Sequence, residues 1–200
     1  MDLLSVEQKI ALLFQKGENL VEMTCVIDNV RDDRLELSLP QYFMRYIDCL
    51  QVGARLTAKA FSKLGTIDFN TVVITSPLED IFSIEVDANA VKLTPGKELP
   101  VVNAIESIDI TSNKGQMSTK TIELSTEYVK ITSNIKLDVD DKLDCILQLP
   151  KDYGTIKFRA IVADVDDVFD DEYKIKFLTI TESSLQDLLY YMYMYSKETI

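Results

Sequence analysis

The chain has 200 residues, a formal net charge of −12 and no histidine. Because lysine and arginine supply most of a protein's affinity for phosphates, this acidic balance disfavours binding to nucleic acid or to anionic lipid. The lack of histidine excludes histidine-based catalytic triads, imidazole acid–base chemistry and the common zinc sites.

The first half of the chain has the pattern of a short helix followed by β-strands. Ser5 to Gln8 has the form of a capping box, and apolar residues then recur at helical spacing until Gly17. This predicts an N-terminal helix, which we expect to pack on its own domain rather than to dock a partner. Alternating apolar runs bounded by turn residues then predict strands around 23–27 and 35–39, and over 55–61, 66–75 and 81–86.

These strands follow one another without a helical crossover, which is typical of a small antiparallel barrel. Residues 91–100 then hold two of the five prolines and one of the six glycines, as in an interdomain linker. Strands resume over 101–110, 119–124, 129–133, 142–149, 155–164 and 173–179. We therefore predict an all-β protein with short flanking helices, in which two small antiparallel β-barrels occupy residues 1–92 and 101–200 around a linker at 93–100.

The chain is predicted to end in a helix that begins with the capping-box pattern Ser183 to Gln186. One side carries an apolar stripe sufficient to pack on the second barrel, formed by Leu185, Leu188, Leu189 and Met192. The far side is apolar too, and a helix that is apolar on both faces usually has two neighbours. Two interpretations stay open: simple packing, or an interface for self-association or for a partner. The residues expected at such an interface are Leu185, Leu189, Tyr190, Tyr193 and Met194, of which the three last lie on the far side.

Neither membrane insertion nor secretion is expected. No apolar run approaches the roughly 18 residues that cross a bilayer, and the N-terminal residues are acidic where a secretory signal has a positive flank. Cys25, Cys49 and Cys145 are far apart and odd in number, which is typical of reduced thiols in a core. We expect a cytoplasmic protein.

The residues from Asp164 to Glu172 are dense in carboxylates, but they lack the Asp-x-Asp-x-Asp-Gly order of a calcium loop. We interpret this segment as a solvated hairpin loop rather than a cation site, and Asp138, Asp140 and Asp141 as a turn between strands. Nothing in the sequence marks a pair of carboxylates as convergent. No catalytic residue and no metal ligand is therefore predicted.

Short motifs occur in a characteristic order along the chain. The first half contains Gly17–Glu22, Asp32–Leu35, Leu39–Pro40, Val52–Ala54 and Ile74–Pro77, and the second half contains Ile122–Ser125, Leu147–Pro150 and Tyr173–Phe177. In order and spacing, residues from about 17 to 84 resemble the N-terminal barrel of YcgR-like flagellar brake proteins. The second half is similar to the PilZ domain that follows in that family. The resemblance implies a split barrel, a PilZ-like barrel and a C-terminal helix.

The resemblance also implies a receptor for cyclic di-GMP that acts through protein contacts on the flagellar motor or another machine. In that family, two arginines four positions apart in the interdomain linker hold phosphates and guanine edges. A guanidinium suits this because it offers a flat fork of donors and stacks on purines. An Asp/Asn-x-Ser-x-x-Gly turn supplies further polar contacts, and its glycine lets the backbone come close.

This sequence departs from both parts of that pattern. No arginine lies in the linker region, because the arginines of the chain are Arg31, Arg34, Arg45, Arg55 and Arg159. The cations there are Lys92 and Lys97, and lysine cannot reproduce the bidentate, stacked geometry of arginine. In the turn, Glu123 stands at the acidic position, Ser125 is kept, and Tyr128 occupies the glycine position, where its ring can fill the guanine space. Any remaining ligand site would therefore consist of Lys92, Lys97, Glu123, Ser125 and Tyr128.

Three hypotheses follow from these residues. We expect a non-enzymatic PilZ-family regulator or adaptor in motility or surface behaviour, with lost or weakened cyclic di-GMP binding, with no cofactor, and with Glu123 and Ser125 on an ordinary strand edge. The alternative is a working cyclic di-GMP receptor of the flagellar-brake type, with arginines of the first barrel in support. An enzyme has only scattered carboxylates in its favour. The expected partner is a protein of the motility or envelope machinery, or a second copy bound through the terminal helix, and not nucleic acid.

Overall fold

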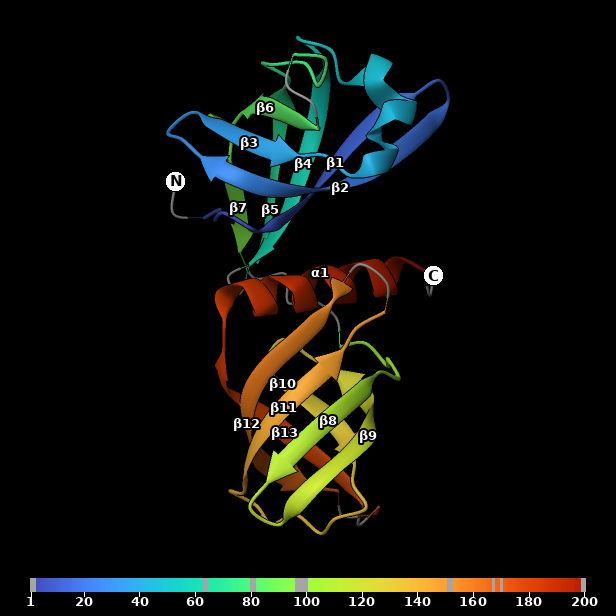
Figure 1. Ribbon diagram of the computed structural model, residues 1–200, viewed down its shortest axis with the longest axis vertical. Helices are drawn as coiled ribbons and strands as arrows, with labels where there is room; N and C mark the ends of the chain where they lie inside the picture. Colours follow the sequence, from blue (N-terminus) through green and yellow to red (C-terminus); the bar gives the residue numbers. More distant parts are fainter. Residues whose placement is uncertain are drawn as a thin grey trace. The chain divides into compact units, whose positions relative to one another are not determined.

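The computed structural model describes residues 3–62, 65–79, 82–95, 101–150, 153–166, 168–169 and 171–198. The chain divides into two compact units, Met1–Lys97 and Glu98–Ile200. Both units are built mainly of antiparallel strands, which confirms the predicted all-β class with short helices (Figure 1). In the part of the chain that the structure describes, no helix is both long enough and apolar enough to span a bilayer.

The described part of the first unit is one curled sheet of seven strands, in the order β6-β3-β2-β1-β4-β5-β7. An isolated bridge between Val73 and Val86 brings the end of β5 to the edge strand β6, so the sheet curls into a half-barrel. The elements are β1 (Lys9–Lys16), β2 (Asn19–Val30), β3 (Arg34–Ser38), the 3-10 helix η1 (Gln41–Cys49), β4 (Arg55–Ser62), β5 (Gly65–Val72), β6 (Ser83–Asp87) and β7 (Lys92–Pro95).

The hairpin of β2 and β3 forms as the alternation predicts. The apolar residues of both strands, such as Met23 and Leu35, are fully buried, while their neighbours are more exposed. Arg31 and Arg34 exchange backbone hydrogen bonds of 2.9 and 3.4 Å, which close the turn at Asp32 and Asp33. Local pattern and final structure agree here because the two strands are neighbours in the sequence.

The prediction of an N-terminal helix is wrong, because its residues form strand β1. The capping-box contact itself is present, since the backbone N–H of Ser5 donates to Oε1 of Gln8 over 3.0 Å. Glu7, however, has a φ of 69°, a left-handed conformation that no helix can continue. The side-chain amide of Gln8 then donates to the carbonyl oxygen of Phe61 over 3.1 Å, which fixes the segment against β4.

Strand β1 is stabilised by pairing that helical spacing does not reveal. Gly17 has a φ of 63°, and the turn that it makes places Lys16 opposite Asn19, so that β1 pairs with β2 along its whole length. The run Ile10 to Phe14 buries alternate residues in the sheet core. Pairing on both sides, with β2 and with β4, outweighs the local preference for a helix.

Helix η1 has no counterpart among the predicted elements. It follows Pro40 and buries Phe43, whose ring lies edge-on to that of Phe82 at 5.4 Å. Tyr46 follows three residues later and packs against Phe14. The sequence signal for this helix is an apolar residue at every third position, which is the period of a 3-10 helix.

The predicted linker, 93–100, begins inside this sheet. Residues 93–95 belong to β7, which pairs with the start of β5 through Ile67 opposite Leu93 and Thr66 opposite Thr94. Residues 96–100 lie outside the described part of the chain. The first sheet therefore extends through Pro95, and the predicted domain bounds stay a prediction.

The second unit contains a closed barrel of six described strands, in the order β10-β13-β12-β11-β8-β9. All the strands predicted after the linker are present, but the first begins only at Ser107, because Val102 forms an isolated bridge with Leu124 instead. The elements are β8 (Ser107–Ser112), β9 (Gly115–Leu124), β10 (Tyr128–Thr132), β11 (Lys142–Gln148), β12 (Thr155–Val165), β13 (Glu172–Ile180) and α1 (Glu182–Glu198).

Helix α1 lies across one end of this barrel and belongs to its core (Figure 1). Leu188, Tyr191 and Met192 are buried with the strand residues of the barrel. The hydroxyl of Tyr191 also donates to the carboxylate of Glu106 over 2.5 Å. The helix begins slightly earlier than predicted, because the hydroxyl of Thr181 rather than that of Ser183 accepts the capping hydrogen bond.

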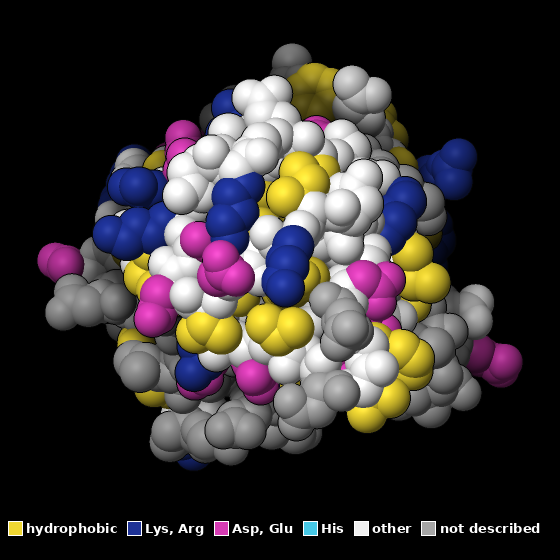
Figure 2. Space-filling view, turned by 90° about the horizontal axis from the view of Figure 1, so that it is seen from below, with side chains coloured by type: hydrophobic (Ala, Val, Ile, Leu, Met, Phe, Trp, Pro, Cys, Tyr) yellow, Lys and Arg dark blue, Asp and Glu magenta, His cyan; other side chains and the backbone are white. Residues whose placement is uncertain are grey.

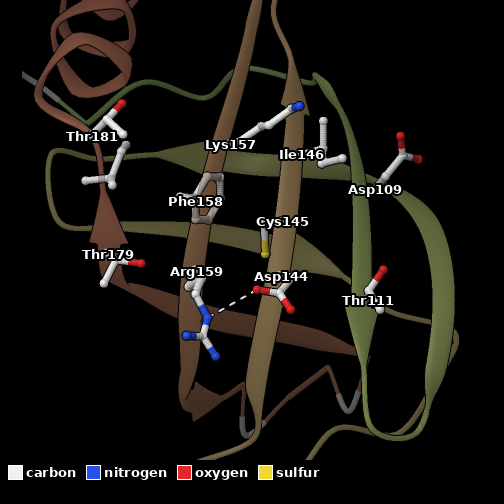
Figure 3. Close-up of a pocket in the computed structure, with 11 residues that line it drawn as sticks. Asp109, Thr111, Asp144, Cys145, Ile146, Lys157, Phe158, Arg159, Thr179 and Thr181 are labelled. Atoms are coloured by element: carbon white, nitrogen blue, oxygen red, sulfur yellow. Dashed lines mark ion pairs between the residues drawn. The ribbon is translucent and has the colours of Figure 1, made fainter.

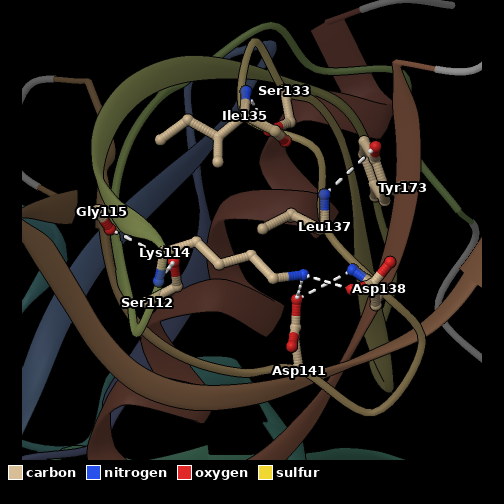
Figure 4. Close-up of polar contacts among 9 residues, drawn as sticks. All are labelled: Ser112, Lys114, Gly115, Ser133, Ile135, Leu137, Asp138, Asp141 and Tyr173. Atoms are coloured by element: carbon tan, nitrogen blue, oxygen red, sulfur yellow. Dashed lines mark hydrogen bonds and ion pairs between the residues drawn. The ribbon is translucent and has the colours of Figure 1, made fainter.

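The opposite end of the barrel is held by Lys114, which lies in the turn between β8 and β9 (Figure 4). Its Nζ donates to Oδ2 of Asp138 and Oδ2 of Asp141, each over 2.6 Å. The backbone N–H of Asp138 and this ammonium group lower the pKa of Asp141. Lys114 thereby ties the β8–β9 turn to the predicted turn before β11.

Candidate functional site

Three of the predicted site residues, Glu123, Ser125 and Tyr128, lie together at the hairpin of β9 and β10. Leu124 is opposite Val129 in the register, and both side chains are fully buried in the barrel. Because side chains alternate along a strand, Glu123 and Tyr128 lie on the outer face of the barrel. Glu123 and Tyr128 are therefore neighbours on one surface.

Ser125 is used within the hairpin itself. Its backbone N–H donates to the carbonyl oxygen of Tyr128 over 2.9 Å, and its hydroxyl oxygen accepts the N–H of Glu127 over 3.4 Å. The residue is only 7% exposed. The serine therefore stabilises the turn, as a local side-chain acceptor commonly does.

Tyr128 contacts a predicted site residue at one end and a lysine on its ring face. Its hydroxyl donates to Oε1 of Glu123 over 2.6 Å, and this hydrogen bond, with burial as a smaller cause, raises the pKa of Tyr128 to about 12. Nζ of Lys174, on β13, lies 3.8 Å from the centre of the ring, within the range of a cation–π contact. Tyr128 thus engages both the carboxylate and a cation of this surface.

The second lysine of this surface, Lys130, has two carboxylate partners. Its Nζ lies 2.6 Å from Oε2 of Glu172 and 2.9 Å from Oδ2 of Asp166. The hydrogen bond from Lys130, followed by those from the N–H groups of Val168 and Phe169, lowers the pKa of Asp166 to about 2. Lys130 is therefore held by its own chain.

A small cavity of about 240 Å³ lies between these side chains. Its lining carries three carboxylates and two ammonium groups and consists of Glu123, Tyr128, Lys130, Asp164, Asp166 and Lys174. A phosphate entering it meets more negative than positive charge, and each cation already has a partner. Nucleotide recognition normally requires the opposite balance.

The other two predicted ligand residues belong to the first unit. Lys92 is an exposed residue of β7 in the first unit, and Lys97 lies outside the described residues. Arg31 and Arg34 both donate to Glu85, over 3.2 and 3.3 Å. Within the first unit, these two arginines are thus engaged by a carboxylate of β6.

The predicted interaction residues of α1 fall into two groups. Leu185, Leu189 and Tyr190 are at most 1% exposed, while Tyr193 and Met194 are partly exposed. The ring centre of Tyr190 lies 6.1 Å from that of Tyr153. The interface on this helix stays a prediction, with Tyr193 and Met194 as its more exposed members.

Sequence reasoning missed Lys130, Lys174 and Asp166. A partial signal exists, because Tyr128 and Lys130 are two positions apart on one strand and so share a face. The register that places Lys174 opposite Lys130 is not visible in the sequence. Cross-strand neighbours depend on pairing between distant segments.

A further cavity, of about 480 Å³, lies on the outside of β8, β11, β12 and β13 (Figure 3). Asp144 and Arg159 form an ion pair of 3.2 Å in it. Lys157 and Asp109 add one charge of each sign. The charges balance, and none of the predicted site residues lines this cavity.

No family model and no curated protein matches this sequence. Several solved structures do match this chain. MotI/DgrA, the inhibitor of motility of Bacillus subtilis, is 12% identical with a TM-score of 0.45, over 98% of this chain and 99% of that chain. YcgR of Escherichia coli in complex with c-di-GMP is 10% identical with a TM-score of 0.45, over 96% and 85%. MrkH of K. pneumonia in complex with c-di-GMP is 13% identical with a TM-score of 0.42, over 97% and 90%.

Proposed function

We propose that this chain is a non-enzymatic regulator or adaptor of the PilZ type, which acts through protein contacts in motility or surface behaviour and has lost or weakened cyclic di-GMP binding. The observation that carries this proposal is the contact of Tyr128 with Glu123 and Lys174. In the family that the sequence resembles, a glycine at this position leaves room for the ligand. Here a tyrosine ring occupies the position and satisfies the polar groups around it.

Electrostatics supports the same proposal. Cyclic di-GMP is a dianion, and its family receptors use linker arginines that this sequence lacks. The two lysines near the hairpin are engaged, Lys130 by two carboxylates and Lys174 by the ring of Tyr128. A ligand would have to displace these contacts, each worth roughly 1 kcal/mol or less at an exposed site, without gaining a bidentate arginine in return.

Titration calorimetry of the full chain with cyclic di-GMP tests the proposal. We expect no saturable heat in the low micromolar range or tighter. Saturable binding there, at one or two ligands per chain, overturns it. The variant Tyr128→Gly with arginines in place of Lys92 and Lys97 is expected to gain affinity, because the ring is removed and the guanidinium groups are restored. The matched control keeps the two arginines together with Tyr128.

A second candidate, a working receptor, is favoured by the cavity beside Tyr128 and by the two lysines in its lining. Under this hypothesis, Tyr128 moves aside when the nucleotide binds. Ser125→Ala and Lys97→Ala then abolish the heat, whereas Ser118→Ala, an exposed position further along β9, leaves it unchanged. Equal heats for all three variants exclude this candidate.

A further inference from the structure

Two loops at the Lys114 end of the second barrel carry the same four residues, Asp-Val-Asp-Asp, at 138–141 and 164–167. The first loop lies against the end of β12, the strand that leads into the second loop. The N–H of Asp140 donates to the carbonyl oxygen of Val162 over 2.9 Å, and the N–H of Val162 donates to that of Asp141 over 3.0 Å. The N–H of Ser133 also donates to the carbonyl oxygen of Asp171 over 2.8 Å. The loops therefore form one surface.

The β12–β13 loop holds two apolar side chains out in solvent. Val168 is 79% exposed and Phe169 is 56% exposed. Oδ1 of Asp166 accepts the N–H groups of both residues, over 3.0 and 3.2 Å, and the N–H of Glu172 donates to the carbonyl oxygen of Phe169 over 3.0 Å. The apolar pair is thus fixed in place by hydrogen bonds and does not pack on the barrel.

The neighbouring loop repeats this arrangement with Val139, which is 54% exposed between Asp138 and Asp140. Asp140 has a φ of 72°, a conformation that a non-glycine residue seldom adopts. Lys114 holds this loop through Asp138 and Asp141 in the way that Lys130 holds the other through Asp166 and Glu172. Each apolar tip is therefore held by one lysine reaching from a neighbouring element.

Around these apolar tips the charge is strongly negative. Among the described residues of the loops at this end, 112–115, 133–142, 164–166, 168–169 and 171–172, seven are acidic and three are basic. Figure 2 looks onto this end of the barrel and shows hydrophobic side chains lying beside acidic ones, with lysine or arginine side chains among them. Exposed apolar groups within a charged rim are typical of protein interfaces, where the apolar groups give affinity and the rim gives orientation and partner choice.

We propose that this acidic loop surface, centred on Val139, Val168 and Phe169, docks a basic amphipathic segment of a partner protein. Phe169 and Val168 enter the apolar side of that segment, and its lysines or arginines face the surrounding aspartates. Charge complementarity selects this occupant, because a second copy of this chain would present the same negative surface. The preformed turn reduces the entropy lost on binding. The inference rests on the proposed adaptor function and gives the chemistry of its partner.

Fluorescence anisotropy of a labelled helical peptide, made of leucine and lysine at amphipathic spacing, tests this surface on the full chain. We expect saturable binding that weakens as salt increases, while a matched leucine and glutamate peptide does not bind. Phe169→Ser is expected to weaken binding at least about tenfold, as loss of a central aromatic anchor does. Because Phe169 is exposed, this variant keeps the melting temperature of the parent chain.

The matched control is Leu178→Ser, which removes an exposed apolar side chain on β13; its affinity for the peptide is expected to equal that of the parent. Equal affinities for Phe169→Ser and the parent mean that net charge alone holds the peptide, and this overturns the proposal. A mass in light scattering that falls in Phe169→Ser identifies a second copy as the occupant and also overturns it. Calorimetry with cyclic di-GMP does not involve Phe169, so either test can fail without the other.

Discussion

Replacing Leu188 by alanine tests whether helix α1 is a structural part of the second barrel. The side chain is fully buried with Tyr191 and Met192 in the barrel core. A leucine-to-alanine change at such a site removes the transfer free energy of the lost carbons and leaves a cavity, at a cost of about 3 kcal/mol in unfolding free energy. For a unit of this size, that loss lowers the melting temperature by roughly 12–24 °C.

The melting temperature of the full chain is measured by calorimetry. Its unfolding free energy is measured by urea titration, with the transition of the second unit followed by circular dichroism. Met194→Ala is the matched control on the same helix, because this side chain is partly exposed. The control is expected to change the unfolding free energy by less than about 1 kcal/mol. If Leu188→Ala behaves like Met194→Ala, α1 is not packed in the core, and its apolar face is free for a partner.

Two further predictions concern the hairpin surface. Tyr128→Phe removes the hydrogen bond to Glu123 and is expected to lower the unfolding free energy by about 1 kcal/mol at neutral pH. The pKa of Tyr128 is raised from 10.0 to about 12 in the folded chain, so the hydrogen bond contributes fully to stability below pH 10, and this contribution disappears as the pH rises to 12. A difference in unfolding free energy between Tyr128→Phe and the parent that persists above pH 12 refutes the assignment. Lys130→Met removes the main cause of the low pKa of Asp166, and nuclear magnetic resonance titration is expected to show this carboxyl moving from about 2 toward its ordinary 3.8. The stability that Asp166 contributes is present above the ordinary value and is lost as the pH falls through 2. Lys157→Met, on β12 in the lining of the larger cavity, serves as the control. An unchanged pKa of Asp166 in Lys130→Met contradicts the pairing.

Most strands of the two units could be predicted because their evidence is local. Alternation at Met23 and Leu35, with aspartates at the turn between them, needs no knowledge of other segments. The same holds for the C-terminal helix, whose stripe at Leu188 and Met192 is buried as its spacing predicts. A period of two or of 3.6 is a property of a few neighbouring residues.

Local evidence failed where distant segments competed. The capping-box contact between Ser5 and Gln8 is real, yet pairing with β2 and β4 makes the following residues a strand. Contacts between residues far apart in the chain outweigh a local preference here.

The class of fold, the positions of most strands, and the departure of Glu123 and Tyr128 from a nucleotide-binding pattern follow from the sequence alone. The contacts that these two residues make instead depend on the tertiary structure. The barrel register brings Lys174 over the ring of Tyr128 and Tyr128 onto Glu123, so that the polar groups satisfy one another. A residue's identity is local, but its hydrogen-bond partner depends on which strands pair, and that is fixed only when the barrel closes.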